Sequence, residues 1–98
     1  MKIVVSERAA KWYQDEELTS SGFIRFYPRY GFGGHIPGFA LAVSSEKPEN
    51  IHASTEVNQI TFYVDEKDAW YFHNVDLEIT WNESLAEPTF QFIQHQEQ

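Results

Sequence analysis

The residues with the most distinctive chemistry are the glycines of the segment YGFGGHIPGF, which runs from Tyr30 to Phe39. Four of the five glycines of the chain lie in this segment, together with one histidine and no carboxylate. Clustered glycines let backbone N–H groups converge on an anion, and two arginines, Arg25 and Arg29, lie shortly before this stretch. The resulting hypothesis is a ligand site, for a small anion, made of Arg25, Arg29, Gly33, Gly34, His35 and Gly38.

Nucleotide-binding motifs do not fit this segment. A phosphate-binding P-loop needs a lysine and then Ser or Thr directly after its glycines, whereas Gly34 is followed by His35, Ile36 and Pro37. The dinucleotide motif needs a helix at this place, and a strand is expected instead. A simpler interpretation is a wide hairpin connection whose glycines adopt positive φ angles, and the sequence favours that connection over an anion site.

The histidines suggest a second alternative, a divalent metal site. None of the four shows the i,i+4 spacing of a metal pair on a helix; they are His35, His52, His73 and His95. Imidazole suits zinc, copper or nickel, so the alternative is a metal held at the glycine-rich segment by His35 with His95. The acids Asp65, Glu66 and Asp68 are interpreted as a helix start rather than a cluster. No arrangement typical of catalysis is present, and we expect no enzyme.

Composition excludes several classes of partner. The chain has 98 residues and no cysteine. Its net charge of −8 disfavours nucleic acid and anionic membranes as partners. No apolar run is long enough to cross a bilayer, and the N-terminus does not resemble a signal peptide. We therefore expect a cytoplasmic protein of one domain, residues 1–98, with a polar tail over about 94–98.

The pattern of apolar residues predicts the elements that must position these groups. Alternation or β-branched runs predict strands at 2–5, 23–27, 39–43, 60–64, 76–81 and 89–93. Helical spacing predicts a helix over 7–18 that is capped by Ser6 and buries Ala9, Trp12 and Tyr13. A second helix is expected to start at Asp65, with Asp68 completing a capping box, and to end at Asn74. The order is typical of an α+β domain with antiparallel or mixed sheets.

With these elements in place, the chain resembles the HesB-like domain, the fold of the A-type iron–sulfur carriers. The resemblance covers about residues 2–93 and rests on three stretches: VVSERAAKW, the motif Gly33-Gly34-His35-Ile36-Pro37-Gly38-Phe39, and VDEKDAWYFHNVDLEITW. It implies a small β-rich sandwich or pseudo-barrel of mixed or antiparallel strands with two short helices.

The chain departs from this family at the metal ligands. Carriers of the family use one cysteine in the glycine-rich loop and two in a C-terminal tail, whereas this chain has none. Ile36 stands at the place of the first cysteine, or His35 if the match shifts by one residue. Thiolates hold iron–sulfur clusters, so we expect no such cofactor.

The resemblance therefore implies a cysteine-free branch and a non-enzymatic module that binds a protein partner or a ligand. Iron–sulfur assembly proteins are the partners that the family suggests. Aromatic residues in 23–32 and 70–73 are also candidates for a face that forms homo-oligomers.

Overall fold

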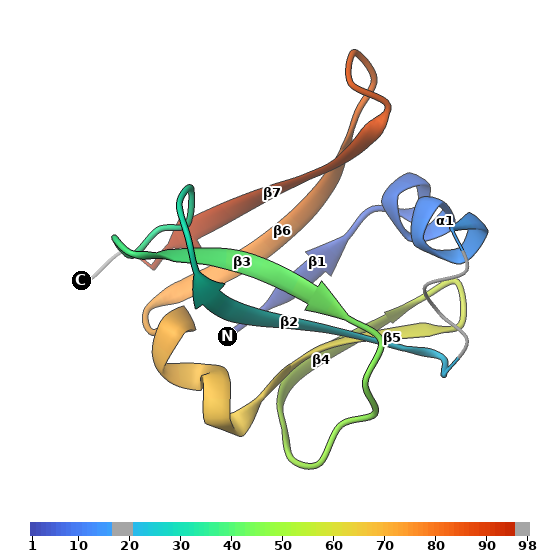
Figure 1. Cartoon of the computed structure of the whole chain (residues 1–98). Helices are drawn as coiled ribbons and strands as arrows, with labels where there is room; N and C mark the ends of the chain where they lie inside the picture. Colours follow the sequence, from blue (N-terminus) through green and yellow to red (C-terminus); the bar gives the residue numbers. More distant parts are fainter. Residues whose placement is uncertain (17–20, 96–98) are drawn as a thin grey trace.

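The structure, a computed structural model, describes residues 1–16 and 21–95 (Figure 1). Seven strands and two helices are found in these ranges. In chain order they are β1 (Ile3–Val5), α1 (Glu7–Asp15), β2 (Phe23–Tyr30), β3 (Phe39–Ser44), β4 (Ile51–Val57), β5 (Ile60–Asp65), the 3-10 helix η1 (Glu66–Phe72), β6 (Val75–Asn82) and β7 (Glu87–Gln94).

The strands form two mixed sheets that face each other across one core. One sheet has the order β1-β6-β7, with β1 parallel to β6 and β7 antiparallel to it. The other has the order β3-β2-β5-β4, in which β2 and β5 are parallel and the outer pairs are antiparallel. Side chains from both sheets meet in the core, among them Ile24, Phe26, Leu77 and Ile79, all fully buried. The α+β prediction is confirmed.

Helix α1 starts where the sequence predicted it. The Ser6 hydroxyl accepts a hydrogen bond from the Ala9 N–H at 3.1 Å, which satisfies one of the free donors of the first turn. Ala9 and Tyr13 are buried as expected, while Trp12 is only half-buried. The helix ends at Asp15 with Glu16 as its C-cap, and the remainder of the predicted span, 17–18, lies outside the described residues.

Strand β4 is the element that the sequence analysis did not predict. Its sequence, IHASTEV, mixes polar and apolar residues, and it forms the edge of the four-stranded sheet, where only alternate side chains are half-buried. The two residues that join it to β5, Asn58 and Gln59, have φ angles of 52° and 66°. Two consecutive residues with positive φ are typical of a tight hairpin turn, and this turn places β4 antiparallel to β5.

The second helix is a 3-10 helix, and only part of its predicted capping is confirmed. Asp65 caps it by accepting a hydrogen bond from the Lys67 N–H at 3.2 Å, and Asn74, with φ of 60°, follows its end. Burial raises the pKa of Asp65, but backbone hydrogen bonds from Lys67 and Asn50 outweigh it and lower the pKa overall. The predicted capping box is wrong, because Asp68 is buried and pairs with Arg25 instead.

The two ends of the described chain meet at Asp76. Its carboxylate accepts hydrogen bonds from the Lys2 N–H at 2.7 Å and from Nε2 of His95 at 2.8 Å. The hydrogen bond from His95, helped by that from Lys2, lowers the pKa of Asp76 below its ordinary value. A carboxylate with a lowered pKa in the folded state stabilises that state wherever it is ionised.

Asp76→Asn is therefore expected to lower the free energy of unfolding at pH 7 by up to about 1 kcal/mol, the size typical of an exposed pair. The loss exists above the unfolded pKa of about 4 and disappears as pH falls through the lowered folded pKa. Urea unfolding of both proteins at pH 7 and at about pH 2.5 measures it. A difference that is equally large at both pH values would contradict a role for the charge.

Candidate functional site

The glycine-rich segment is the connection between β2 and β3. Tyr30 and Phe39 form the last pair of the β2–β3 ladder, and the backbone closes the loop with a hydrogen bond from Gly31 N–H to Gly38 O at 3.1 Å. Gly33 and Gly38 have φ angles of 92° and 89°, which favour glycine. The simpler interpretation of these glycines, a wide hairpin connection, therefore describes the backbone.

The loop is fixed to the rest of the molecule at Gly34 and His35. The Gly34 N–H donates to Phe39 O at 3.1 Å, and its Cα lies so close to the Tyr71 hydroxyl that a Cβ there would collide with it. Nε2 of His35 donates to the Tyr71 carbonyl, and the imidazole ring lies 4.5 Å from the ring of Phe92 in β7. The loop thus rests on η1 and on the opposite sheet.

A group of aromatic side chains, hereafter the aromatic patch, surrounds this fixed loop. It consists of Tyr30, Phe32, Phe39 and Trp70. The rings of Tyr30 and Phe39 are stacked at 5.4 Å, and Trp70 meets Phe39 edge-on at 5.2 Å. Tyr30 is 89% exposed, Phe32 96% and Trp70 52%. Large rings that are open to solvent are suited to contact another molecule, and those of Tyr30 and Trp70 are also packed against Phe39.

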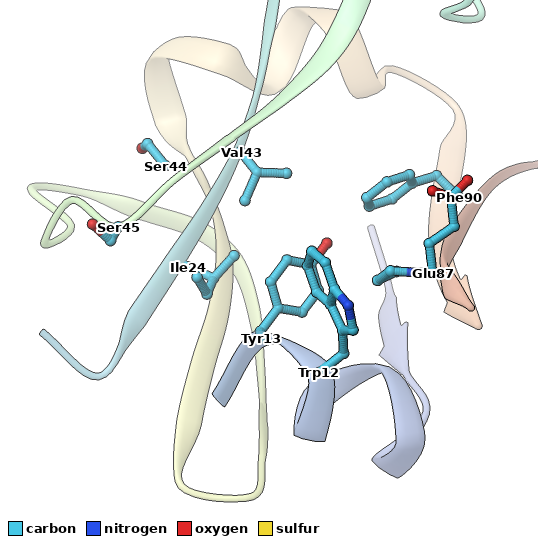
Figure 2. A pocket seen from close by; sticks show the side chains of 9 residues that line it. Trp12, Tyr13, Ile24, Val43, Ser44, Ser45, Glu87 and Phe90 are labelled. Carbon is cyan, nitrogen blue, oxygen red and sulfur yellow. The ribbon is translucent and has the colours of Figure 1, made fainter. Parts of the chain in front are cut away.

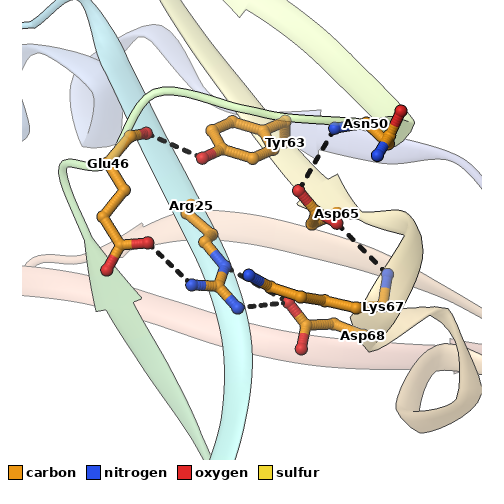
Figure 3. Close-up of polar contacts among 7 residues, drawn as sticks. All are labelled: Arg25, Glu46, Asn50, Tyr63, Asp65, Lys67 and Asp68. Atoms are coloured by element: carbon orange, nitrogen blue, oxygen red, sulfur yellow. Dashed lines mark hydrogen bonds and ion pairs between the residues drawn. The ribbon is translucent and has the colours of Figure 1, made fainter.

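The structure separates the two arginines that the anion hypothesis joined to the loop. Arg25 is buried, and its guanidinium donates to Asp68 at 2.7 Å and to Glu46 at 2.9 Å (Figure 3). The Tyr63 hydroxyl holds the Glu46 backbone by donating to its carbonyl at 2.7 Å. Burial lowers the pKa of Arg25, but the hydrogen bonds and charges of Asp68 and Glu46 outweigh it and raise the pKa.

Of the predicted ligand residues, Gly33, Gly34, His35 and Gly38 therefore lie together in one loop. Arg29 is exposed near the end of β2. The charge of Arg25, in contrast, is already balanced by two carboxylates. Anion binding at the loop stays a prediction that rests on Arg29 and the loop backbone alone.

The two histidines of the metal alternative are bonded to different partners. His35 donates to the Tyr71 carbonyl, and His95 to Asp76. In the described ranges, no group of three or more His, Asp or Glu side chains is arranged to hold a metal ion. The metal alternative thus stays a prediction without a ligand set in the described part of the chain.

An iron–sulfur cluster does not fit the loop either. The chain has no cysteine to supply thiolates. At the place of the first family cysteine, Ile36 packs against the hydrophobic core, and the neighbouring His35 is held by Tyr71. Both candidate positions are therefore used to attach the loop to the fold.

Sequence analysis missed a second feature, a cleft at the other end of β7 (Figure 2). Side chains from α1, β2, β3 and β7 line it, and they are separated by up to about eighty positions in the chain. No local pattern predicts that these residues come together.

Among the described residues, no helix has the length and apolar character needed to span a membrane.

Comparison with known proteins gives relatives along nearly the whole chain, although no family model matches it. A protein of Bacillus subtilis named pyruvate dehydrogenase inhibitor is 36% identical over 94 residues, which is 94% of this chain and 99% of that protein. An uncharacterised protein of Staphylococcus saprophyticus is 30% identical over 95 residues, covering 92% of this chain and 97% of the relative.

A solved structure gives the fold. IscA with its [2Fe-2S] cluster superposes on 94% of this chain and 81% of its own, with a TM-score of 0.57 and 10% identity. At that identity the likeness concerns the backbone, and the HesB-like fold expected from the sequence is confirmed. The chain therefore belongs to the family of the B. subtilis pyruvate dehydrogenase inhibitor, and it has the HesB-like fold without any cysteine.

Proposed function

We propose that this protein is a non-enzymatic inhibitor that binds pyruvate dehydrogenase through the aromatic patch. The name of the B. subtilis relative supports the target, because the match covers 99% of that protein at 36% identity. The aromatic patch is the observation that carries the proposal, since it supplies a surface for a protein partner. We also propose that this protein acts in the cytoplasm.

The composition of the patch is that of an interface centre. Aromatic residues and arginine are enriched among the side chains that dominate binding energy, and charged acids are depleted there. Residues 30–39 contain no carboxylate although the chain carries a net charge of −8, and Arg29 lies beside them. The rest of this protein is acidic and would repel an acidic surface of a partner. The neutral-to-basic patch would not, so an acidic partner is expected to bind there.

The rigidity of the loop favours tight binding. Tyr30 and Phe39 are paired at the ends of β2 and β3, and the loop between them is bonded to Tyr71 and packed on Phe92 through His35. A surface that is ordered before binding loses little conformational entropy on association. Inhibition by occupying a partner's surface requires no catalytic group.

We also propose that the protein acts without an iron–sulfur cluster. The fold connects it with carriers, but neither the loop nor any other part of the sequence supplies thiolates. The buried ionic groups, Arg25 and Asp68, bind each other and are not exposed for chemistry. An assembly role in iron–sulfur biogenesis therefore has only the fold in its favour.

The test is titration of the purified protein into pyruvate dehydrogenase from the organism that encodes it, with NADH formation as the readout. The rate of NADH formation is expected to fall and to reach a plateau when each binding site on pyruvate dehydrogenase holds one molecule of this protein. Phe32→Ala and Trp70→Ala should each raise the half-inhibitory concentration about 30-fold, the effect of a hot-spot residue of about 2 kcal/mol.

Leu85→Ala is the matched control, because Leu85 is also a large exposed apolar residue, at 64%. It lies in the β6–β7 turn, before the start of β7, whereas the loop rests near the end of that strand (Figure 1). This variant should inhibit like the wild type. Absence of inhibition by the wild type would refute the target, and equal losses in all three variants would refute the patch.

A further inference from the structure

A cleft of about 450 Å³ opens between α1 and the first half of β7 (Figure 2). This volume lies within the range of about 300–1,000 Å³ that is usual for small-molecule sites. Its lining is mainly apolar, and its polar lining residues are Ser44, Ser45 and Glu87. The wall residues are Trp12, Tyr13, Ile24, Val43, Pro88 and Phe90.

The walls of the cleft are held by the aromatic core. Tyr13 meets Phe62 edge-on at 5.7 Å, and Phe62 is stacked on Phe26 at 6.0 Å. Phe26 in turn meets Phe90 of the opposite sheet edge-on at 6.0 Å. Because Phe26 and Phe62 are fully buried, they cannot rotate to fill the space, and the cleft is preformed.

Tyr13 provides an unused polar group at this place. The residue is only 3% exposed, and its hydroxyl makes none of the side-chain hydrogen bonds found among the described residues. Among the same residues, the cleft-lining hydroxyl that is itself buried without a partner is that of Ser44. Burial alone raises the pKa of Tyr13, so the phenol stays protonated at neutral pH. In Figure 2 its oxygen points into the space between Val43 and Phe90. A phenol hydroxyl that faces a cleft can donate a hydrogen bond to a ligand there.

The charges around the cleft select the ligand class. Glu87 in the lining and a net charge of −8 disfavour an anion such as a carboxylate. The apolar walls disfavour a cation, which would lose its hydration. We propose that this cleft binds a neutral, largely apolar small molecule whose carbonyl or ring nitrogen accepts a hydrogen bond from Tyr13. The proposal is independent of the inhibitory function, which uses the aromatic patch.

The probe for a test is the neutral aromatic ketone 6-propionyl-2-(dimethylamino)naphthalene, whose emission moves to shorter wavelength in an apolar site. We expect saturable binding of one probe per chain. Two ligand controls separate the contributions: 2-naphthoate adds a charge, and 2-(dimethylamino)naphthalene lacks the carbonyl. Both are expected to bind at least tenfold more weakly than the ketone.

Three variants locate the site. Val43→Phe adds a ring to the wall and should abolish binding of the ketone. Tyr13→Phe removes only the hydroxyl, so it should weaken the ketone about tenfold, as expected for one hydrogen bond, and leave 2-(dimethylamino)naphthalene unchanged. Phe32→Ala, in the aromatic patch, should bind the ketone like the wild type. Thermal unfolding of each variant checks that it is folded.

Several results would overturn the proposal. Binding without saturation in the wild type would mean that the cleft takes no such ligand. Undiminished binding by Val43→Phe would put the probe at another place. If the wild type bound no probe but Val43→Phe lost inhibition of pyruvate dehydrogenase, the cleft would instead receive a side chain of the partner. Equal ketone affinity in Tyr13→Phe would refute the assigned acceptor.

Discussion

Replacing Arg25 with alanine is expected to lower the free energy of unfolding by about 3–5 kcal/mol, the cost of breaking a buried ion pair. The side chains of Arg25 and Asp68 are each only 11% exposed, and the guanidinium donates two hydrogen bonds to the same carboxylate oxygen, Oδ2, at 2.7 and 3.2 Å. Without Arg25, the Asp68 carboxylate stays buried with no charge to balance it. Domains of this size are stable by only about 5–15 kcal/mol, so the loss is severe.

Two further variants distinguish the contributions to this effect. Glu46 also binds Arg25 but is 62% exposed, so Glu46→Gln should cost about 1 kcal/mol or less. Replacing both buried partners, as Arg25→Met with Asp68→Leu, should recover most of the stability that Arg25→Ala loses, because no charge is then left alone. Urea unfolding at pH 7 measures all of them. A loss below about 1 kcal/mol for Arg25→Ala would show that solvent reaches the pair.

Local patterns of the sequence were sufficient for most of the fold. Ser6 and the spacing of Ala9 and Tyr13 fix α1, and the alternation in residues 23–27 predicts the strand that begins β2. These features depend on neighbouring residues only. Strand β4 escaped prediction because an edge strand buries little, so its sequence needs no apolar alternation.

The candidate sites depended on contacts that no local pattern records. Asp68 looked like part of a helix cap, but it meets Arg25, which lies 43 positions away. The sequence predicted the loop, but not that Tyr71 would lie beneath Gly34 or that Trp70 would extend the aromatic patch. The wall of the cleft joins Tyr13 with Phe90 through two core rings. Such meetings follow from the sheet topology and not from spacing.

The position of the loop gives a reason for its glycines that does not involve a ligand. The resemblance to the iron–sulfur carriers implies that the same loop binds a cluster in those proteins. In this chain the loop binds the protein's own fold, because His35 bonds to Tyr71 and Ile36 packs on the core. The outer side of the loop is left open to solvent, and it carries the large apolar side chains of Tyr30 and Phe32, which are 89% and 96% exposed.

Gly34→Ala is expected to lower the free energy of unfolding by about 3 kcal/mol, the cost of forcing atoms into a packed site. The added Cβ would lie 2.5 Å from the Phe39 carbonyl oxygen and would also collide with the hydroxyl of Tyr71, a fully buried ring. The oxygen belongs to the β3 backbone, so no side-chain rotation relieves that contact. The loop must move, and the aromatic patch with it.

Gly33→Ala is the matched control for this change, since a Cβ on Gly33 would meet nothing within 4 Å. Its φ of 92° is unfavourable for alanine, which should cost about 1 kcal/mol. Tyr71→Phe removes the colliding hydroxyl and should restore part, but not all, of the stability lost in Gly34→Ala. Inhibition of pyruvate dehydrogenase should weaken at least tenfold in Gly34→Ala and much less in Gly33→Ala. Equal costs for the two glycines would mean that the loop does not rest on Tyr71, and the rigidity on which the inhibitory surface depends would be lost with it.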